Sequence, residues 1–345
     1  MPLRSGALRA QCYDPTVKRI PSLDGLRAIS ISLVVVGHMA HSGHAPRFFS
    51  QYANLGVRIF FVISGYLITS ILLAEHARTA TISLRDFYIR RAYRIFPAAM
   101  CFILVVVLLY WNTLRWYDIG AALFYLVNFD FVHPWIIAHL WSLSLEEQFY
   151  FLWPSVLRKW YRHRMIILWA MILVAPIARA VLYYFKVEDG GYGNLLTVGD
   201  NLATGCLLAM VGPRLLDVRW KAAALMLVAV VLIPLYDADS RLRTLFALFV
   251  LSPILHFSIA GILAHVVRHP YRLLNLAPVV WLGNISYSLY LWQQPFFDPS
   301  SSSRYGVLGA VGLACASYYL VEKPMLRVRE RMFTSSKSRA TTIAA

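Results

Sequence analysis

The chain has 345 residues, of which 59% are hydrophobic and only 14% are charged. Soluble domains carry about 25% charged residues, so this composition excludes a soluble globular protein and predicts an all-α polytopic membrane protein. The formal net charge of +16 suits either the cytoplasmic loops of a membrane protein or a polyanionic ligand such as a nucleotide cofactor. Membrane lipids are therefore expected partners, and nucleic acid is not.

The sequence predicts one membrane domain with a short segment at each end. Residues 1–21 are polar and basic and are expected to be a cytoplasmic segment without a cleavable signal peptide. Residues 22–325 are expected to form the membrane domain, without internal repeats. Residues 326–345 are expected to be a basic cytoplasmic tail, disordered after about residue 332. The four cysteines show no paired spacing, which predicts neither a disulfide framework nor a metal site. They are Cys12, Cys101, Cys206 and Cys315.

Apolar runs of about twenty residues, the length that crosses a bilayer, predict about ten transmembrane helices. They lie near residues 22–42, 54–74, 96–115, 140–157, 165–185, 194–212, 219–236, 243–267, 278–297 and 306–322. A further apolar segment, 118–138, is interrupted by Asn128, Asp130 and the pair His133 and Pro134, which predicts a re-entrant or interfacial element. With ten helices, the loops on the cytoplasmic side then carry most of the Lys and Arg. This distribution predicts a multi-pass protein of the inner membrane with both termini in the cytoplasm.

The first predicted helix carries two polar residues on one face. Arg27 lies near its cytoplasmic end, and His38 follows eleven residues later. At 100° per residue, eleven steps bring both side chains to the same face, about 16 Å apart along the axis. Ionisable residues inside a membrane are costly and usually face a cavity or a partner, so this face is a candidate path into the membrane. A snorkelling arginine and a hydrogen-bonded structural histidine are the alternatives.

A basic patch begins the third helix, on its cytoplasmic side. It consists of Arg90, Arg91 and Arg94. Arg91 and Arg94 are three residues apart and are therefore neighbours on a helix. The planar guanidinium fork binds phosphate oxygens bidentately, so the patch is a candidate phosphate site. Anchoring of a cytoplasmic loop is the alternative.

A carboxylate lies on the helix that begins near residue 140. His139, Ser142 and Glu146 share one helical face. Because this helix enters from the outside, Glu146 is expected about 10 Å below His139, at the depth of His38. The sequence therefore predicts His38 as a catalytic base and Glu146 as its orienting partner. Glu147 points about 100° away from Glu146 and is the weaker choice.

Two later stretches add candidate substrate-binding residues. Asp200 is a lone intramembrane acid, and Gly205 permits close helix approach beside it. Residues 284–295 contain Tyr287 and Gln293, which join Ser142 as candidate hydrogen-bond donors to an oxyanion. An aromatic belt at the membrane edge is the alternative for the tyrosine.

Six motifs in this order resemble the bacterial acyltransferase-3 family of integral membrane O-acyltransferases. They are LDGLRAISISLVVVGH, GVRIFFVISGYLI, FYIRRAYRIFP, HLWSLSLEEQFYFLWP, SYSLYLW and VEKP, and they cover about residues 19–325. The family's arginine and histidine match Arg27 and His38, its RxxR pair matches Arg91 and Arg94, and its helix glutamate matches Glu146. The resemblance implies transfer of an acyl group, usually acetyl, from cytoplasmic acyl-CoA to a hydroxyl of a carbohydrate or related acceptor. It implies no permanently bound cofactor.

Two positions depart from the family pattern. Gln293 stands where many members have histidine, so the role of that histidine does not carry over. Thr197 stands where members often have arginine before the aspartate that matches Asp200. The sequence shows no fused extracytoplasmic esterase-like domain, so the membrane domain or a partner such as a polysaccharide-assembly protein is expected to serve the acceptor.

The residues and the resemblance together predict a mechanism. The arginines of the basic patch, with Arg27, hold the phosphates of acetyl-CoA or another acyl-CoA at the cytoplasmic face. His38, oriented by Glu146, removes the proton of the acceptor hydroxyl, or is itself transiently acylated; the sequence leaves both routes open. The alternative function is a transporter or flippase that uses Arg27, His38 and Glu146 as a relay. Transporters often show repeated halves, which are not visible here.

Overall fold

A computed structural model describes residues 21–129, 133–186, 193–213, 216–298 and 306–343, and within these ranges all regular secondary structure is helical. Residues 1–20, which include Cys12, lie outside the described ranges, as does Asp130. The longer helices are α1 (Pro21–His41), α2 (Tyr52–Thr79), α3 (Leu84–Leu109), α6 (Leu140–Lys159), α7 (Arg164–Tyr184), α8 (Leu195–Val211), α9 (Trp220–Leu232), α11 (Ser252–Arg268), α12 (Ala277–Gln293), α13 (Gly306–Ser317) and α14 (Lys323–Ile343).

The prediction of an all-α polytopic membrane protein is confirmed. Each predicted span overlaps one of these helices, and the span 243–267 also covers α10 (Arg241–Phe246) and the π-helical turn before α11. Among the described residues, 5 helices are long and apolar enough to cross a membrane. They are Ser22–His41, Arg47–Thr79, Leu84–Leu109, Tyr161–Tyr184 and Arg241–Arg268, and shorter apolar helices cover Leu195–Val211 and Trp220–Leu235.

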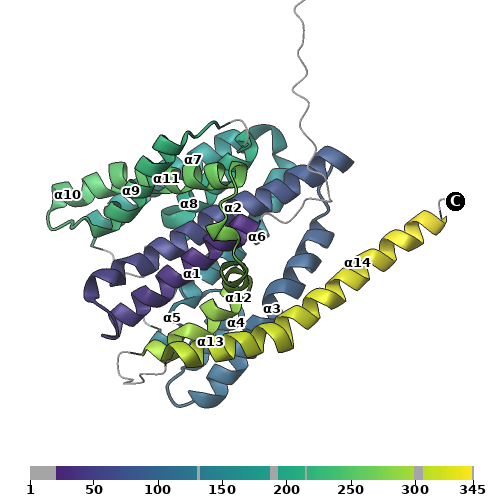
Figure 1. Ribbon diagram of the computed structural model, residues 1–345, viewed down its shortest axis with the longest axis horizontal. Helices are drawn as coiled ribbons and strands as arrows, with labels where there is room; N and C mark the ends of the chain where they lie inside the picture. The colour runs from purple at the N-terminus through teal and green to yellow at the C-terminus, as the bar shows by residue number, and fades with distance from the viewer. Residues whose placement is uncertain (1–20, 130–132, 187–192, 214–215, 299–305, 344–345) are drawn as a thin grey trace, which may run out of the picture.

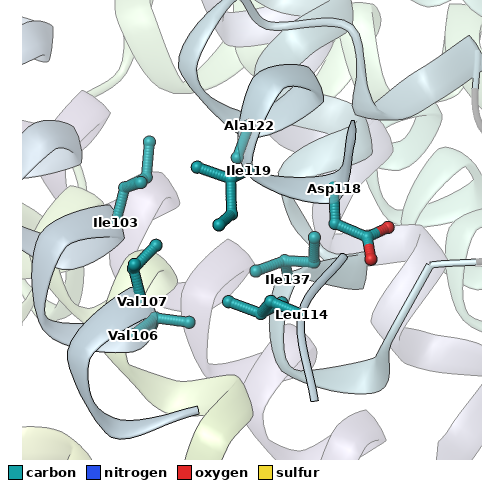
Figure 2. Close-up of a pocket in the computed structure, with 8 residues that line it drawn as sticks. All are labelled: Ile103, Val106, Val107, Leu114, Asp118, Ile119, Ala122 and Ile137. Carbon is teal, nitrogen blue, oxygen red and sulfur yellow. The ribbon is translucent and has the colours of Figure 1, made fainter. Parts of the chain in front are cut away.

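The interrupted apolar segment 118–138 does not form one long helix in its described parts. It contains most of α4 (Trp116–Leu123) and all of α5 (Trp135–Ala138). Figure 2 shows where α4 packs on α3 and α5, around a small apolar pocket of about 10 Å³. The Asp118 carboxylate points away from the apolar side chains and accepts hydrogen bonds from the Arg115 side chain at 2.8 and 2.9 Å. The polar interruptions therefore divide this segment into short helices at the edge of the bundle.

The C-terminal segment is a helix, so the expectation of a disordered tail after about residue 332 is wrong. Helix α14 runs from Lys323 to Ile343, and Figure 1 shows it passing beside α3 and extending beyond the other helices. The Arg90 guanidinium of α3 lies 5.1 Å from the centre of the Phe333 ring on α14. This contact with α3 gives the helix a partner that its polar composition alone does not reveal. The predicted boundary at residue 325 therefore falls inside α14.

Close helix crossings hold α2 at the centre of the bundle. A Cβ atom on Gly65 of α2 would collide with the Leu202 carbonyl oxygen of α8, and one on Gly205 of α8 would collide with the Val62 carbonyl oxygen of α2. The prediction that Gly205 permits close helix approach is confirmed. Small residues at such crossings let helix backbones approach in a membrane, where the hydrophobic effect does not drive helix association.

Candidate active site

A cavity of about 730 Å³ opens between α1, α2, α3, α6, α12 and α14. Its lining follows α2 from Val57 to Ile71, so it extends about 21 Å along that helix at 1.5 Å per residue. Five arginines and four carboxylates contribute to its wall. They are Arg27, Arg90, Arg91, Arg94 and Arg329, and Asp24, Glu146, Glu322 and Glu330.

The two ends of the cavity differ in chemistry. Arg90 Nη2 lies 3.6 Å from Glu75 Oε2, which places it at the C-terminal end of α2; we call this the basic end. Tyr290 contacts Phe60, near the N-terminal end of α2, with ring centres 6.5 Å apart. We call the end formed by Tyr290 and Ser142 the deep end. The structure thus brings the basic patch and Arg27 to one cavity, as the sequence predicted.

Arg27 and Arg94 face the cavity without a close ion pair. Among the described residues, neither guanidinium has a carboxylate within 4.0 Å or a hydrogen-bond acceptor. Both side chains are only partly exposed. Two cations held near each other with no paired anion form a natural site for a phosphate-bearing ligand.

Arg91 is held in place by α6. Its Nη2 lies 3.3 Å from Glu147 Oε1, and its guanidinium carbon lies 3.5 Å from the centre of the Tyr150 ring. Glu147, the weaker choice in the sequence analysis, is therefore the carboxylate that pairs with the RxxR motif. Arg91 retains a buried Nε without a hydrogen-bond partner.

The predicted pair of His38 and Glu146 is not formed. Glu146 lines the cavity and accepts a hydrogen bond from the Tyr150 hydroxyl at 2.8 Å. His38 instead pairs with Gln293 of α12, with 2.8 Å between Nδ1 and Oε1. The family-typical histidine at position 293 is thus replaced here by an amide that contacts the His38 ring.

The prediction failed because it matched the wrong residue of α6 to the depth of His38. His139 Nε2 lies 3.0 Å from the Leu291 carbonyl oxygen, two residues before Gln293. His139 is therefore at the level of His38, and Glu146 lies about 10 Å from that level along α6, towards the basic end, where the next residue, Glu147, pairs with Arg91. Helical periodicity correctly grouped His139 with Glu146 on one face but does not specify the relative height of two helices.

The contacts of Gln293 determine which nitrogen of His38 carries a proton. The Gln293 amide nitrogen donates to the Tyr290 carbonyl oxygen at 3.4 Å, which directs Oε1 towards His38. Because Oε1 only accepts, Nδ1 of His38 must donate, and Nε2 of the neutral ring keeps its lone pair. Nε2 has no hydrogen-bond partner among the described residues. The arrangement presents Nε2 as a base.

A tryptophan from the interrupted segment covers His38. The Trp135 ring of α5 meets the His38 ring edge-on, with centres 5.6 Å apart, and stacks on His41 at 4.8 Å. Trp135 was missed by the sequence analysis, and the polar interruption of 118–138 was its only signal.

Hydrogen bonds connect His38 to the deep end of the cavity. Beyond Gln293 and the Tyr290 main chain, the Tyr290 hydroxyl donates to the His139 carbonyl oxygen at 2.9 Å. Ser142 Oγ lies 2.5 Å from the same hydroxyl. Ser142 and Tyr290 line the cavity, and His38 does not. The candidates Ser142, His139 and Gln293 therefore form one connected group.

Tyr287 lines the cavity from a different position. Its hydroxyl donates to the Ile95 carbonyl oxygen of α3 at 2.9 Å. Tyr287 therefore joins α12 to the helix that carries the basic patch.

Asp200 does not reach the cavity. It is fully buried, with Oδ2 2.9 Å from Arg179 Nη1. The same Arg179 donates to the Thr197 carbonyl oxygen, so the partner that the family places at position 197 is supplied here from α7. Ser252 accepts from both Arg179 and Arg58, at 3.2 and 3.3 Å. Asp200 thus ties α7 to α8 in a closed cluster apart from the cavity.

Two cavity residues of the C-terminal region were missed. Glu322, in the VEKP motif, is 3% exposed and accepts a hydrogen bond from Ser288 at 3.0 Å. Arg329 of α14 lines the cavity seven residues later. The VEKP motif was the available signal for Glu322. Arg329 was missed because residues 326–345 were expected to be a cytoplasmic tail.

These features define a polytopic helical membrane protein with a deep cavity lined by arginines. A family model described as an acyltransferase domain matches residues 20–314. The chain belongs to this family, acyltransferase-3, as its motifs predicted.

Curated relatives are similar over most of this chain. Peptidoglycan O-acetyltransferase OatA of Listeria monocytogenes is 31% identical over 313 residues, which cover 81% of this chain and 49% of the relative. O-acetyltransferase OatA of Staphylococcus aureus is 31% identical over 320 residues, covering 82% of this chain and 51% of the relative. The chain thus spans about half the length of these relatives. No solved structure matches it.

We predict that Asp200→Ala destabilises the protein by about 3–5 kcal/mol, because it leaves the buried Arg179 charge without its carboxylate. Unfolding of the purified protein in detergent would measure this. The matched control is Asp239→Ala, which removes an ion pair whose side chains are 58% and 55% exposed and should cost about 0–1 kcal/mol. If both variants lost the same free energy of unfolding, the ion pair of Asp200 and Arg179 would contribute no more to stability than an exposed pair.

Proposed function

We propose that the protein is a membrane O-acyltransferase that transfers an acyl group from acyl-CoA to a hydroxyl of a carbohydrate acceptor. The acyl group that we propose is acetyl. One observation carries this proposal. A single cavity gathers arginines at one end, and hydrogen bonds connect its other end to a histidine whose Nε2 is available as a base. Membership of the acyltransferase-3 family supports it.

We place acyl-CoA, the donor, in the cavity with its phosphates at the basic end and its acyl group at the deep end. The phosphates of acyl-CoA would lie among Arg27, Arg94 and the other arginines, where guanidinium groups bind phosphate oxygens strongly. The long pantetheine arm would extend along the cavity, whose length is about 21 Å, and bring the thioester to Ser142 and Tyr290. Those side chains would have to part for the acyl carbon to reach His38.

The chemical step requires one base. The acceptor hydroxyl would give its proton to Nε2 of His38 as its oxygen attacks the thioester carbonyl carbon. The carbon–sulfur bond then breaks, the ester forms, and the departing thiolate takes up the proton. An acyl-His38 intermediate remains the second route. Ser142, Tyr287 and Gln293 remain the candidate donors to the oxyanion, and Tyr287 would have to release its hydrogen bond to the Ile95 carbonyl oxygen to serve.

The acceptor is proposed from the relatives. The Listeria monocytogenes relative is named a peptidoglycan O-acetyltransferase, which favours a surface glycan or a lipid-linked sugar for this chain. Polysaccharide-assembly proteins are proposed as partners for its delivery. About ten membrane crossings, with both termini in the cytoplasm of the inner membrane, would place the basic end of the cavity on the side that supplies acyl-CoA.

The structure gives the transporter alternative less support. A relay of Arg27, His38 and Glu146 requires these side chains to communicate, and Glu146 bonds to Tyr150 while His38 bonds to Gln293. Consumption of acyl-CoA by purified protein in detergent distinguishes the two functions, because transport needs a sealed membrane and acyl transfer does not.

We predict that His38→Ala lowers acyl transfer by about 10²–10⁴-fold, the usual contribution of a general base. The measurement is release of CoA thiol from acetyl-CoA in the presence of a glycan acceptor. His41→Ala, which removes the neighbouring ring that also packs on Trp135, is the control and should retain most activity. Near-normal transfer by His38→Ala would rule out the assigned base.

Gln293 provides a separate test of the tautomer. Gln293→Leu removes the acceptor for Nδ1–H and should lower kcat by about tenfold or more, with the KM for acetyl-CoA unchanged. Gln293→Glu keeps an acceptor oxygen at this position and should retain more activity than Gln293→Leu. If the two variants lose activity equally, Gln293 does not orient His38.

A further inference from the structure

The C-terminal helix contributes a cation to the cavity that neither the sequence motifs nor the family resemblance assigns. Arg329 lies on α14, and its side chain is 23% exposed. It lines the cavity together with Leu326 and Glu330 of the same helix. Its nearest carboxylate oxygen, Glu330 Oε1, lies 3.8 Å from Nη2, too far for a hydrogen bond. The guanidinium donors of Arg329 are therefore available to a ligand.

Arg329 stands near two other arginines as well as near Glu330. Burial, followed by the positive charge of Arg94 and also that of Arg90, lowers the pKa of Arg329, although Glu330 opposes this. Arg90 itself lies 3.6 Å from Glu75 Oε2, also too far for a hydrogen bond. Like charges gathered in a partly buried place raise the free energy of the empty site, and an anion that binds there relieves the repulsion.

The order of the arginines along the cavity indicates which anion this is. Glu322, the cavity carboxylate near Arg94 and Arg27, lies seven residues before Arg329, so Arg329 is about 10 Å further along α14. Arg90 is likewise about 6 Å further from the deep end than Arg94 along α3. Arg90 and Arg329 thus continue the row of cations outward from Arg27 and Arg94, and Arg94 lies close enough to affect Arg329 as well.

Coenzyme A carries two separate phosphate groups. Starting from the acyl end, the pantetheine arm is followed by a diphosphate and then by an adenosine whose ribose bears a phosphate monoester. If the thioester lies at the deep end, the diphosphate falls at Arg27 and Arg94, and the monoester falls at Arg90 and Arg329. A monoester carries more charge than a diester and makes strong hydrogen bonds to guanidinium groups.

We propose that Arg329 and Arg90 form a subsite for the ribose 3′-phosphate of the acyl-CoA donor, so that α14 is part of the donor site. This inference rests on the proposed function. On this proposal, α14 helps the protein to select its donor. A donor without the 3′-phosphate, such as 3′-dephospho-acetyl-CoA, loses the contacts with Arg90 and Arg329 and keeps those with Arg27 and Arg94.

The test compares two donors with the full-length protein in nanodiscs of phosphatidylcholine. For the wild type, the KM should be about 10- to 100-fold higher for 3′-dephospho-acetyl-CoA than for acetyl-CoA, as expected for hydrogen bonds between charged groups. Arg329→Gln should raise the KM for acetyl-CoA by about tenfold or more and leave the KM for the dephospho donor unchanged. Arg331→Gln removes the same charge from an exposed position two residues later and should change neither KM.

The opposite results overturn the proposal. An Arg329→Gln variant with an unchanged KM for acetyl-CoA, or with equally raised values for both donors, would exclude the 3′-phosphate as its ligand. Nanodiscs that contain phosphatidylglycerol distinguish a lipid phosphate from the donor phosphate. If Arg329→Gln alters only the response to this anionic lipid, with no preference between donors, the subsite binds lipid and the proposal is wrong.

Failure of the proposed function would look different. In that case the wild type consumes neither donor under any of these conditions. The subsite is then tested by calorimetric titration with adenosine 3′,5′-diphosphate, which carries the same 3′-phosphate. Tighter binding by the wild type than by Arg329→Gln supports the subsite, and equal or absent binding overturns it.

Discussion

The cost of placing charge inside a membrane organises this structure. A charged side chain among lipid tails must find an opposite charge, hydrogen-bond partners or a cavity that admits water or ligand. The protein uses both solutions in separate places. Arg179 and Asp200 neutralise each other in a closed cluster between α7 and α8. Arg27 and Arg94, in contrast, have no carboxylate within 4.0 Å in the described chain and line an open cavity. The first arrangement is structural, and the second carries the proposed phosphate site.

Helix α1 joins the two halves of the candidate site. Arg27 and His38 lie on one face of it, about 16 Å apart, so one rigid helix relates the cavity to the proposed base. Gly283 of α12 packs against the Asp24 main chain so closely that a Cβ atom there would collide with its carbonyl oxygen. This crossing fixes α12 beside α1 and thereby positions Gln293 against His38. The close crossing of α1 and α12 at Gly283 thus helps to set the distance between Gln293 and the His38 ring.

The sequence predicted those features that depend on a single helix. Apolar runs located the helices, and helical periodicity placed Arg27 with His38 and Arg91 with Arg94. It failed where two helices must be aligned with each other. The depth of Glu146 relative to His38 depends on the height and tilt of α6 against α1, which periodicity does not specify. Arg329 was missed for a related reason: a basic, polar helix shows no apolar run, and its contact with α3 through Phe333 arises only in the folded chain. Trp135 lies on a helix too short to be recognised from pattern alone.

The central claim is that the cavity binds acyl-CoA with its acyl end directed towards His38. A cryo-electron microscopy structure of the protein with bound CoA tests it most directly. The account predicts the diphosphate within hydrogen-bond distance of Arg27 and Arg94, and the sulfur beside Ser142 and Tyr290. CoA bound outside this cavity, or with its adenosine at the deep end, would contradict it.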